Sequence, residues 1–109
     1  MSGVRMQSAW VPLDEEHVGE VGGYMGVYEI ASADGAVVKI GFAGGRSVFG
    51  LRGELQGELD GPGTSFRYEI TTAYLSRYKE LLMVHVADHG ALPAGNASAL
   101  DTVGRLSPG

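Results

Sequence analysis

The sequence predicts an α+β domain built on a small three-stranded antiparallel sheet flanked by helices. Two runs rich in aromatic and β-branched residues, 24–31 and 36–42, are joined by Ala33-Asp34-Gly35. An Asp-Gly pair between two such runs is the strongest short-range signal of a β-hairpin. A third run, 65–71, alternates apolar and charged side chains, which is typical of a half-buried strand. Apolar residues at helical spacing follow the second and the third runs.

Length and composition indicate one globular domain. The chain has 109 residues, of which 44% are hydrophobic and 19% charged, enough for one modest core. It has no cysteine, which excludes disulfides and cysteine-based zinc sites. No apolar run approaches the roughly 18 residues that cross a bilayer. The first ten residues lack the layout of a signal peptide, so we expect a cytoplasmic protein with no membrane partner.

The pattern divides the chain into three segments. Residues 1–23 mix apolar residues and acids without a period, and we expect an irregular N-terminal arm with at most one short edge strand near Trp10. The strand and helix signals fall within 24–96, which we take as the folded domain. Small residues and a closing Pro-Gly over 97–109 predict a weakly ordered tail.

Two helices are expected within the domain. The first opens at Arg46 and runs to Asp60, where an Asp-Gly-Pro-Gly sequence stops it. The second is capped by Thr71 or Thr72 and ends at Gly90. The order is therefore strand, strand, helix, strand, helix.

The hairpin carries the first candidate for chemistry. If Ala33-Asp34-Gly35 forms the loop, Tyr28 and Lys39 lie near each other across the two strands, about 5 Å apart on one face. A cation beside a phenol stabilises the phenolate, and Tyr28 would need its pKa lowered by about 2 to 3 units to act as a base at neutral pH. The alternative, which these two residues taken alone favour, is a cation–aromatic pair that only packs.

Other candidates lie outside the hairpin. Arg46 and Arg52 carry forks that suit a phosphate, or they are solvated surface residues. Glu80 could hold one hard divalent cation completed by waters, or pair with Arg77 one helical turn away. Asn96 lies in a loop, where an asparagine more often closes a turn than contacts a substrate.

The distribution of charge along the chain is compatible with a binding face. A net charge of −5 gives no global attraction to nucleic acid. Between residues 36 and 53, however, the only charged residues are Lys39, Arg46 and Arg52. This basic stretch is either a chance gap between acids or a binding face.

Taken in order, these residues resemble the motifs of the GIY-YIG nuclease family. Gly26-Val27-Tyr28 resembles the first motif and Lys39-Ile40-Gly41 the second. Arg52 falls in the first helix, where that family carries an essential arginine. Glu80-Leu81-Leu82 followed by Pro93-Ala94-Gly95-Asn96 resembles the family's closing pattern. The order of elements is also similar, and the resemblance spans 24–96.

The resemblance implies a DNA endonuclease that hydrolyses phosphodiester bonds with a single Mg²⁺ or Mn²⁺. Tyr28 would be the general base that activates water, and Lys39 stands where many members have a second tyrosine. Arg52 would stabilise charge on the scissile phosphate. Glu80 would bind the metal, and Asn96 would order the site. This division supplies a base, charge neutralisation and a metal-held oxygen, which phosphodiester cleavage needs.

The chain also departs from the family pattern. The spacing from Gly41 to Arg52 is stretched by several residues, which leaves Arg46 open as the essential arginine. Lys39, Arg46 and Arg52 are the residues expected to contact DNA. One active site cuts one strand, so double-strand cleavage would require a homodimer or repeated binding. The alternative function is a catalytically degenerate domain that binds nucleic acid or a protein partner.

Overall fold

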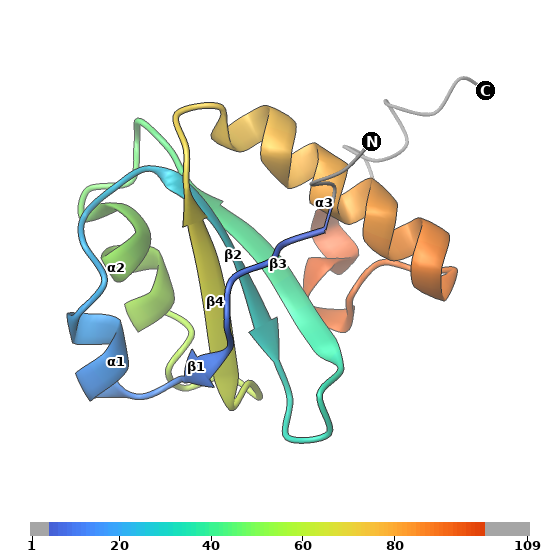
Figure 1. Cartoon of the computed structure of the whole chain (residues 1–109), viewed down its shortest axis with the longest axis horizontal. Coiled ribbons are helices and arrows are strands. Elements are labelled where there is room, and N and C mark those ends of the chain that lie inside the picture. Colours follow the sequence, from blue (N-terminus) through green and yellow to red (C-terminus); the bar gives the residue numbers. More distant parts are fainter. Residues whose placement is uncertain (1–4, 100–109) are drawn as a thin grey trace.

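The computed structural model describes residues 5–99 and has the predicted α+β class, with an antiparallel sheet of four strands. The strands, whose order in the sheet is β1-β4-β2-β3, are β1 (Val11–Pro12), β2 (Gly26–Ala31), β3 (Val37–Ala43) and β4 (Ser65–Ile70). The helices are α1 (Glu15–Gly19), α2 (Gly50–Gln56), α3 (Tyr74–His89) and the 3₁₀ helix η1 (Ala94–Ala99) (Figure 1).

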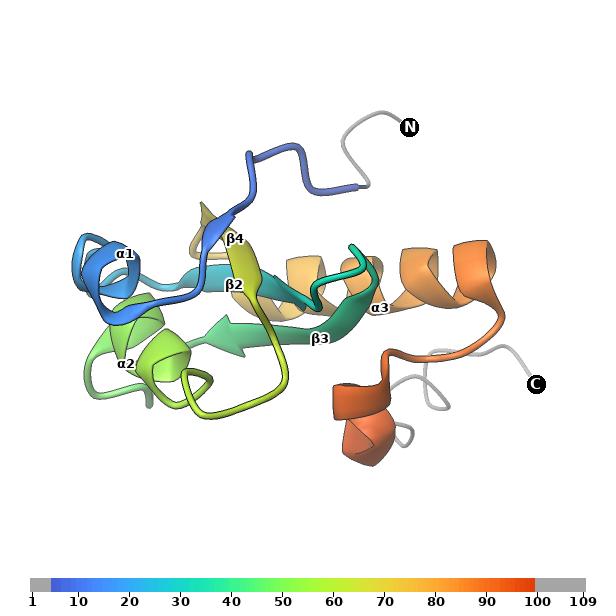
Figure 2. The same ribbon diagram turned by 90° about the horizontal axis from the view of Figure 1, so that it is seen from below.

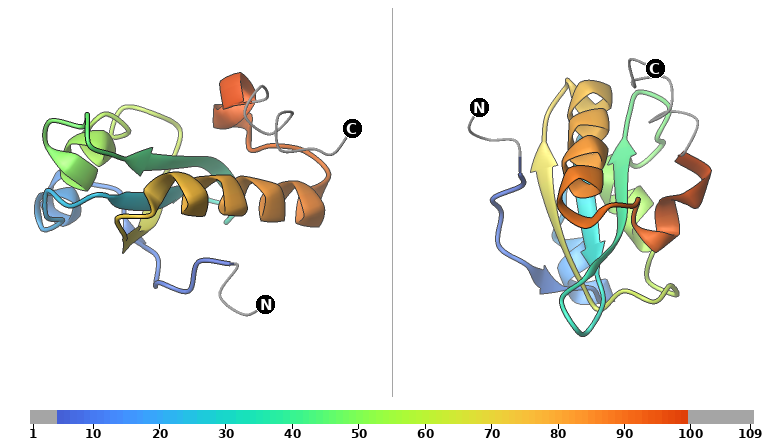
Figure 3. Two further views of the ribbon diagram at one scale, coloured as in Figure 1. Left: turned by 90° about the horizontal axis from the view of Figure 1, so that it is seen from above. Right: turned by 90° about the vertical axis from the view of Figure 1, so that its right-hand side faces the viewer.

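The sheet separates two hydrophobic cores. Figure 1 views the sheet nearly edge-on, with α1 and α2 on one side and α3 on the other, and the right-hand view of Figure 3 looks onto the face that α3 covers. Because successive strand residues point to opposite faces, Tyr28 and Ile30 enter the core of α1 and α2, whereas Val27 enters the core of α3. The helices close these cores with Val18, Leu51 and Leu55 on the first face and with Leu81 and Leu82 on the second.

The hairpin of β2 and β3 confirms the first sequence prediction. Gly35 has a φ of 89°, the left-handed conformation that glycine adopts without a steric penalty. The Ser32 amide donates to the Ala36 carbonyl at 2.9 Å and closes the loop. Among residues 5–99, β2 is the one strand that pairs with β3, so β3 forms one edge of the sheet.

The prediction of three strands is wrong, because a fourth strand comes from the N-terminal segment. β1 pairs with β4, with Val11 opposite Phe66, and it is the short edge strand expected near Trp10. Two residues are too few to show the alternation by which a strand is found in a sequence. The sequence pattern therefore predicts only the three longer strands of the sheet.

The described part of the N-terminal segment is also less irregular than expected. The carboxylate of Asp14 accepts a hydrogen bond from the His17 amide at 2.8 Å and caps α1. Val18 and Val21 then enter the core, with 0% and 3% of their surface exposed. Helix α1 has only five residues, so its stability comes from this burial rather than from helix propensity.

The first predicted helix is longer than the one observed. α2 begins at Gly50, whose φ of 62° does not continue a helix backward toward Arg46. It ends at Gln56, and residues 57–60 form turns. The glycines at 50, 53 and 57 reduce helix stability by roughly 1 kcal/mol each relative to alanine, which accounts for the shortening.

The second predicted helix ends where the sequence predicts, but its N-terminal cap differs from the prediction. α3 ends at Gly90, whose φ of 80° makes the expected left-handed cap. Its N-cap is Ala73 and has no side-chain hydrogen bond. The hydroxyl of Thr71 instead accepts a hydrogen bond from the amide of Ala73, two residues further along the chain, at 3.0 Å.

The loop expected after Pro93 continues into η1, which lies beyond the edge formed by β3, on the side away from the N-terminal segment (Figure 2). Residues 97–99 of the expected weakly ordered tail belong to η1, and residues 100–109 lie outside the described residues. No helix of the described chain is long and apolar enough to cross a membrane.

Candidate functional site

The candidate residues of the hairpin meet in a pocket of about 320 Å³ at the open edge of β3, here called the edge pocket. Strands β2 and β3, the loop before α2, helices α2 and α3, and η1 all contribute to its wall. The lining residues are Tyr28, Lys39, Ile40, Gly41, Phe42, Ser47, Glu54, Tyr78, Gly95 and Asn96.

Tyr28 reaches the edge pocket from the central strand because a glycine lies opposite it. The register of β2 and β3 places Tyr28 directly across from Gly41. A Cβ added to Gly41 would lie 2.7 Å from Cε2 of Tyr28 and would also overlap its Cζ and Oη atoms. The phenol ring therefore lies over the bare backbone of β3. This position carries the hydroxyl outward to the edge of the sheet.

The Tyr28 hydroxyl meets a carboxylate there rather than the cation that the sequence predicts. It donates a hydrogen bond to Oε2 of Glu58 at 2.9 Å. The Nζ atom of Lys39 lies 2.5 Å from the same oxygen. Lys39 is opposite Ile30 in the ladder, so Tyr28 and Lys39 are diagonal neighbours on one face. Glu58, rather than direct contact, joins them.

This arrangement raises the pKa of Tyr28 well above its usual value, the opposite of the predicted direction. The first cause is burial, since only 2% of the residue's surface is exposed, and the second is the negative charge of Glu58. Both disfavour the phenolate. Tyr28 is thus a protonated phenol at neutral pH, with its hydrogen directed at Glu58.

Asn96 fixes the strand that forms the edge pocket. Its side-chain oxygen accepts from the Ile40 amide and its side-chain nitrogen donates to the Ile40 carbonyl, both at 2.7 Å. The amide group thereby satisfies backbone groups of β3 that no neighbouring strand reaches. Asn96 is 4% exposed. Its observed contacts order β3, and its role in a catalytic site stays a prediction.

The two candidate arginines occupy different positions. Arg46 lines a pocket of about 270 Å³ that shares Phe42 and Ser47 with the edge pocket. Arg52 lines neither pocket. It stands two positions before Glu54 on α2, about 200° around the helix. Arg46 thus lines a pocket that adjoins the edge pocket and Arg52 does not, and the choice between them as the essential arginine stays open.

Glu80 is not brought to the edge pocket. It stands two positions after Tyr78 on α3, so the two side chains leave the helix in nearly opposite directions. Its Oε1 atom accepts from Nη1 of Arg77 at 2.6 Å, the ion pair that the sequence offers as its alternative. The same Arg77 also holds both carboxylate oxygens of Glu69, at 2.8 and 3.0 Å.

The carboxylate of Glu80 thus lies outside the lining of the edge pocket and has a cation, Arg77, as its partner. Within residues 5–99, no three histidine, aspartate or glutamate side chains gather as a metal-binding group.

Two carboxylates at the site were missed by the sequence prediction. Glu58 joins Tyr28 and Lys39. Glu54 lines the edge pocket, and its Oε2 atom accepts from the Ser47 hydroxyl at 3.1 Å. The two acids are four residues apart on the predicted helix, a spacing that places them on one face. That spacing is the signal by which the sequence could have identified them.

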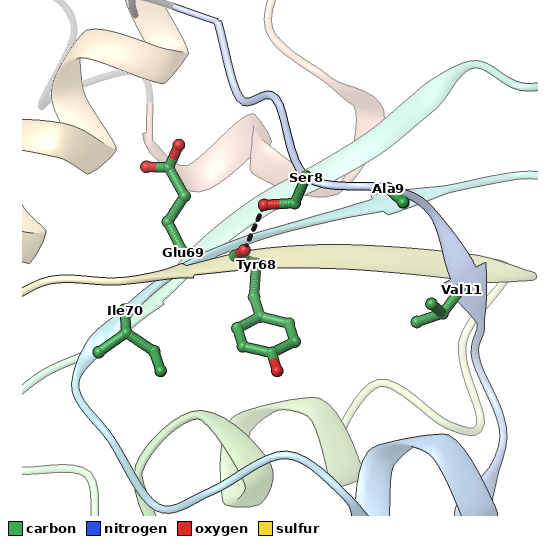
Figure 4. Close-up of a pocket in the computed structure, with 6 residues that line it drawn as sticks. All are labelled: Ser8, Ala9, Val11, Tyr68, Glu69 and Ile70. Carbon is green, nitrogen blue, oxygen red and sulfur yellow. Dashed lines mark hydrogen bonds between the residues drawn. The ribbon is translucent and has the colours of Figure 1, made fainter.

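A larger pocket, of about 520 Å³, lies at the opposite edge of the sheet beside β4 (Figure 4). The Ser8 hydroxyl donates to the Tyr68 carbonyl at 2.8 Å, while Tyr68 and Ile70 point away from Glu69. The carboxylate of Glu69 is already paired with Arg77. This pocket brings together no acid–base set comparable to that of the edge pocket.

Comparison with known proteins adds one match. Residues 4–88 match the model of a domain of unknown function, DUF7508. No curated protein and no solved structure matches the chain significantly. The family's description contains no reference to GIY-YIG nucleases, so that resemblance stays a prediction. Since the match covers most of its length, the chain belongs to the DUF7508 domain family.

Proposed function

We propose that the protein is a DNA endonuclease that hydrolyses phosphodiester bonds at the edge pocket. One observation carries the proposal: Tyr28 and Lys39 both line the edge pocket, and the hydroxyl of the first and the ammonium of the second converge on a single carboxylate, that of Glu58. Such a set combines groups that move a proton with a cation that neutralises phosphate charge. Phosphodiester hydrolysis needs both.

The surroundings of the edge pocket support an anionic substrate. Arg46 lies on the adjoining wall and offers a planar fork for phosphate oxygens. Lys39 is 37% exposed at its side chain, so its ammonium can be approached from solvent. With an overall charge of −5, binding would rest on these few local contacts. We therefore expect DNA affinity to fall as salt concentration rises.

The divalent cation, the role of Glu80 and a cytoplasmic location rest on the family resemblance and on the sequence. The proposed reaction uses one Mg²⁺ or Mn²⁺ ion, for which Glu80 is the candidate ligand. Hard cations of this kind are commonly held by one or two carboxylates together with water and substrate phosphate oxygens. The roles proposed for Tyr28, Lys39 and Arg46 do not depend on this cation.

The test is nicking of supercoiled plasmid in the presence of Mg²⁺ or Mn²⁺. Tyr28→Phe should lower the nicking rate by about 100-fold or more, the usual contribution of a positioned acid–base group. Tyr24→Phe is the matched control, since Tyr24 is 57% exposed and lies outside the edge pocket. Equal rates for the Tyr28→Phe variant and the wild type would remove Tyr28 from the mechanism.

A second pair of variants separates the arginines. Arg46→Gln should weaken DNA binding and nicking by about 10-fold, whereas Arg52→Gln should leave both near the wild-type level, because a lost phosphate contact is worth about 1.4 kcal/mol or more. The reverse result would support the helix position that the family resemblance implies. Glu80→Gln in a Mn²⁺ titration tests the metal ligand in the same assay.

The alternative is a non-catalytic interaction module, and a specific observation favours it. The Tyr28 hydroxyl is buried and the Lys39 charge is paired, which also describes a structural network. Two adjacent apolar side chains, Val48 and Phe49, are meanwhile 85% and 63% exposed, as at a site that binds a partner. A correctly folded wild-type protein that cuts no form of DNA in either metal would establish this alternative over the nuclease.

A further inference from the structure

Glu58 accepts the hydrogen bond that the Tyr28 hydroxyl donates, at 2.9 Å. It lies in the turn after α2, where its amide donates to the Leu55 carbonyl at 2.9 Å. This turn directs the side chain back across the sheet, and 15% of that side chain is exposed. The hydroxyl hydrogen of Tyr28 therefore points to Oε2 of Glu58.

This geometry decides how Tyr28 could activate water. A phenol has one hydrogen to donate and lone pairs that accept. A protonated phenol takes a hydrogen from water only if its own leaves at the same time. Since burial and the charge of Glu58 hold the pKa of Tyr28 high, a free phenolate is not the base at neutral pH. The hydrogen bond from Tyr28 to Glu58 provides an acceptor to which the phenol hydrogen can be transferred.

We propose that Glu58 is the terminal proton acceptor of the edge pocket and that Tyr28 relays the proton to it. The inference rests on the proposed nuclease function. The attacking water gives one hydrogen to Oη of Tyr28, and the hydrogen of Tyr28 passes to Oε2 of Glu58. The remaining hydroxide forms a bond to phosphorus, the bond to the leaving sugar oxygen breaks, and that oxygen takes a proton from solvent.

The balance closes without any co-reactant other than water. One water and one phosphodiester give a phosphomonoester and an alcohol, and Glu58 then returns its proton to solvent. The same step changes the role of Lys39. Once Glu58 is protonated, its ion pair with the Nζ atom, at 2.5 Å in the resting protein, loses its electrostatic basis. The ammonium is then released to stabilise the charge that develops on the phosphate.

Three variants of the full chain test the relay in the plasmid-nicking assay. Glu58→Gln keeps an oxygen that accepts from Tyr28 but cannot take up its proton, and its rate should fall by about 100-fold or more. Glu16→Gln is the matched control, because it removes an exposed carboxylate on α1 that lies outside the edge pocket. The double variant Tyr28→Phe/Glu58→Gln should be no slower than the worse single variant, since the two residues act as one unit.

The pH profile separates a proton acceptor from a merely structural residue. Wild-type nicking should fall on the acid side as the acceptor becomes protonated, and this limb should disappear in Glu58→Gln. Glu58→Asp, with a carboxylate set back by one methylene, should keep the limb at a reduced rate. A structural role would lower the rate in both variants and leave the limb in place. Melting curves confirm that each variant is folded.

The outcomes separate the relay from the nuclease proposal. If the wild type nicks DNA and Glu58→Gln nicks at the wild-type rate, or keeps the acid limb, the relay is overturned and the nuclease proposal stands. If the folded wild type nicks no DNA with Mg²⁺ or Mn²⁺, the nuclease proposal fails and the relay fails with it. The expected result is that Glu58→Gln loses both the rate and the acid limb, whereas Glu16→Gln stays near the wild type.

Discussion

Replacing Gly41 by alanine should both destabilise the protein and displace the candidate catalytic hydroxyl. The added Cβ would lie 2.7 Å from Cε2 of Tyr28 and would overlap Cζ and Oη. The ring cannot move away easily, because it is 2% exposed and its hydroxyl is bonded to Glu58. Inserting a carbon into such a packed site costs about 1 to 3 kcal/mol. We expect about 2 kcal/mol for Gly41→Ala.

Thermal unfolding followed by circular dichroism measures this effect. In a domain of about 100 residues each kcal/mol shifts the melting temperature by roughly 4 to 8 °C, so Gly41→Ala should lower it by about 8 to 16 °C. Gly19→Ala is the matched control. A Cβ at Gly19 would meet nothing within 4 Å, and its φ is not positive. That variant should be as stable as the wild type or more stable by about 0.5 kcal/mol.

A double-mutant cycle identifies the cause of the loss. If the overlap with the Tyr28 ring is responsible, Tyr28→Leu should relieve it. The pair Gly41→Ala/Tyr28→Leu should then cost at least about 1 kcal/mol less than the sum of the single variants. Additive losses, or an unchanged melting temperature in Gly41→Ala, would show that the ring does not depend on the bare backbone of β3.

Three further outcomes follow from other contacts. Asn96→Ala removes two hydrogen bonds to the β3 backbone and should reduce the free energy of unfolding by about 2 kcal/mol in urea titrations. Phe66→Ala, at a fully buried position, should cost about 3 to 5 kcal/mol, whereas Phe49→Ala, at a site 63% exposed, should change the stability by less than about 0.5 kcal/mol in the same experiment. The third outcome concerns pH. The hydrogen bond with Asp14 raises the pKa of His17, and the hydrogen bond from the His17 amide lowers the pKa of Asp14. The stabilisation from His17 is lost as pH rises through its raised pKa, and that from Asp14 is lost as pH falls through its lowered pKa. Asp14→Asn should therefore lower the melting temperature most between about pH 4 and 6.5, and an equal effect at pH 9 would contradict this origin.

Several elements could be predicted from the sequence because they depend on the conformational preferences of individual residues. Gly35 and Gly90 adopt positive φ values at the turn and the helix end where the sequence predicts them, because few other residues accept that conformation. The three longer strands were found by their β-branched, aromatic and alternating residues. The short strand β1 was not counted among the strands of the sheet, because its two residues are held by β4 and not by a pattern of their own.

The candidate site was less predictable, because register and helix rotation decide which side chains meet. The sequence places Tyr28 and Lys39 on one hairpin, but a bulge between Ile30 and Ala31 is part of the register that makes them diagonal. Arg52 and Glu80 have suitable chemistry. Their angular positions on α2 and α3 nevertheless direct them away from the edge pocket, a consequence of how each helix is seated on the sheet.

The α+β class, the hairpin loop at Gly35 and the end of α3 at Gly90 could be predicted from the sequence, because they depend on residues close together in the chain. The position of Glu58 between Tyr28 and Lys39, in contrast, follows from the tertiary fold. That meeting joins residues up to 30 positions apart, and it depends on a turn after α2 and on the bare backbone of Gly41. Burial at that point raises the pKa of Tyr28, so the fold, and not the residue types, sets which group can accept a proton.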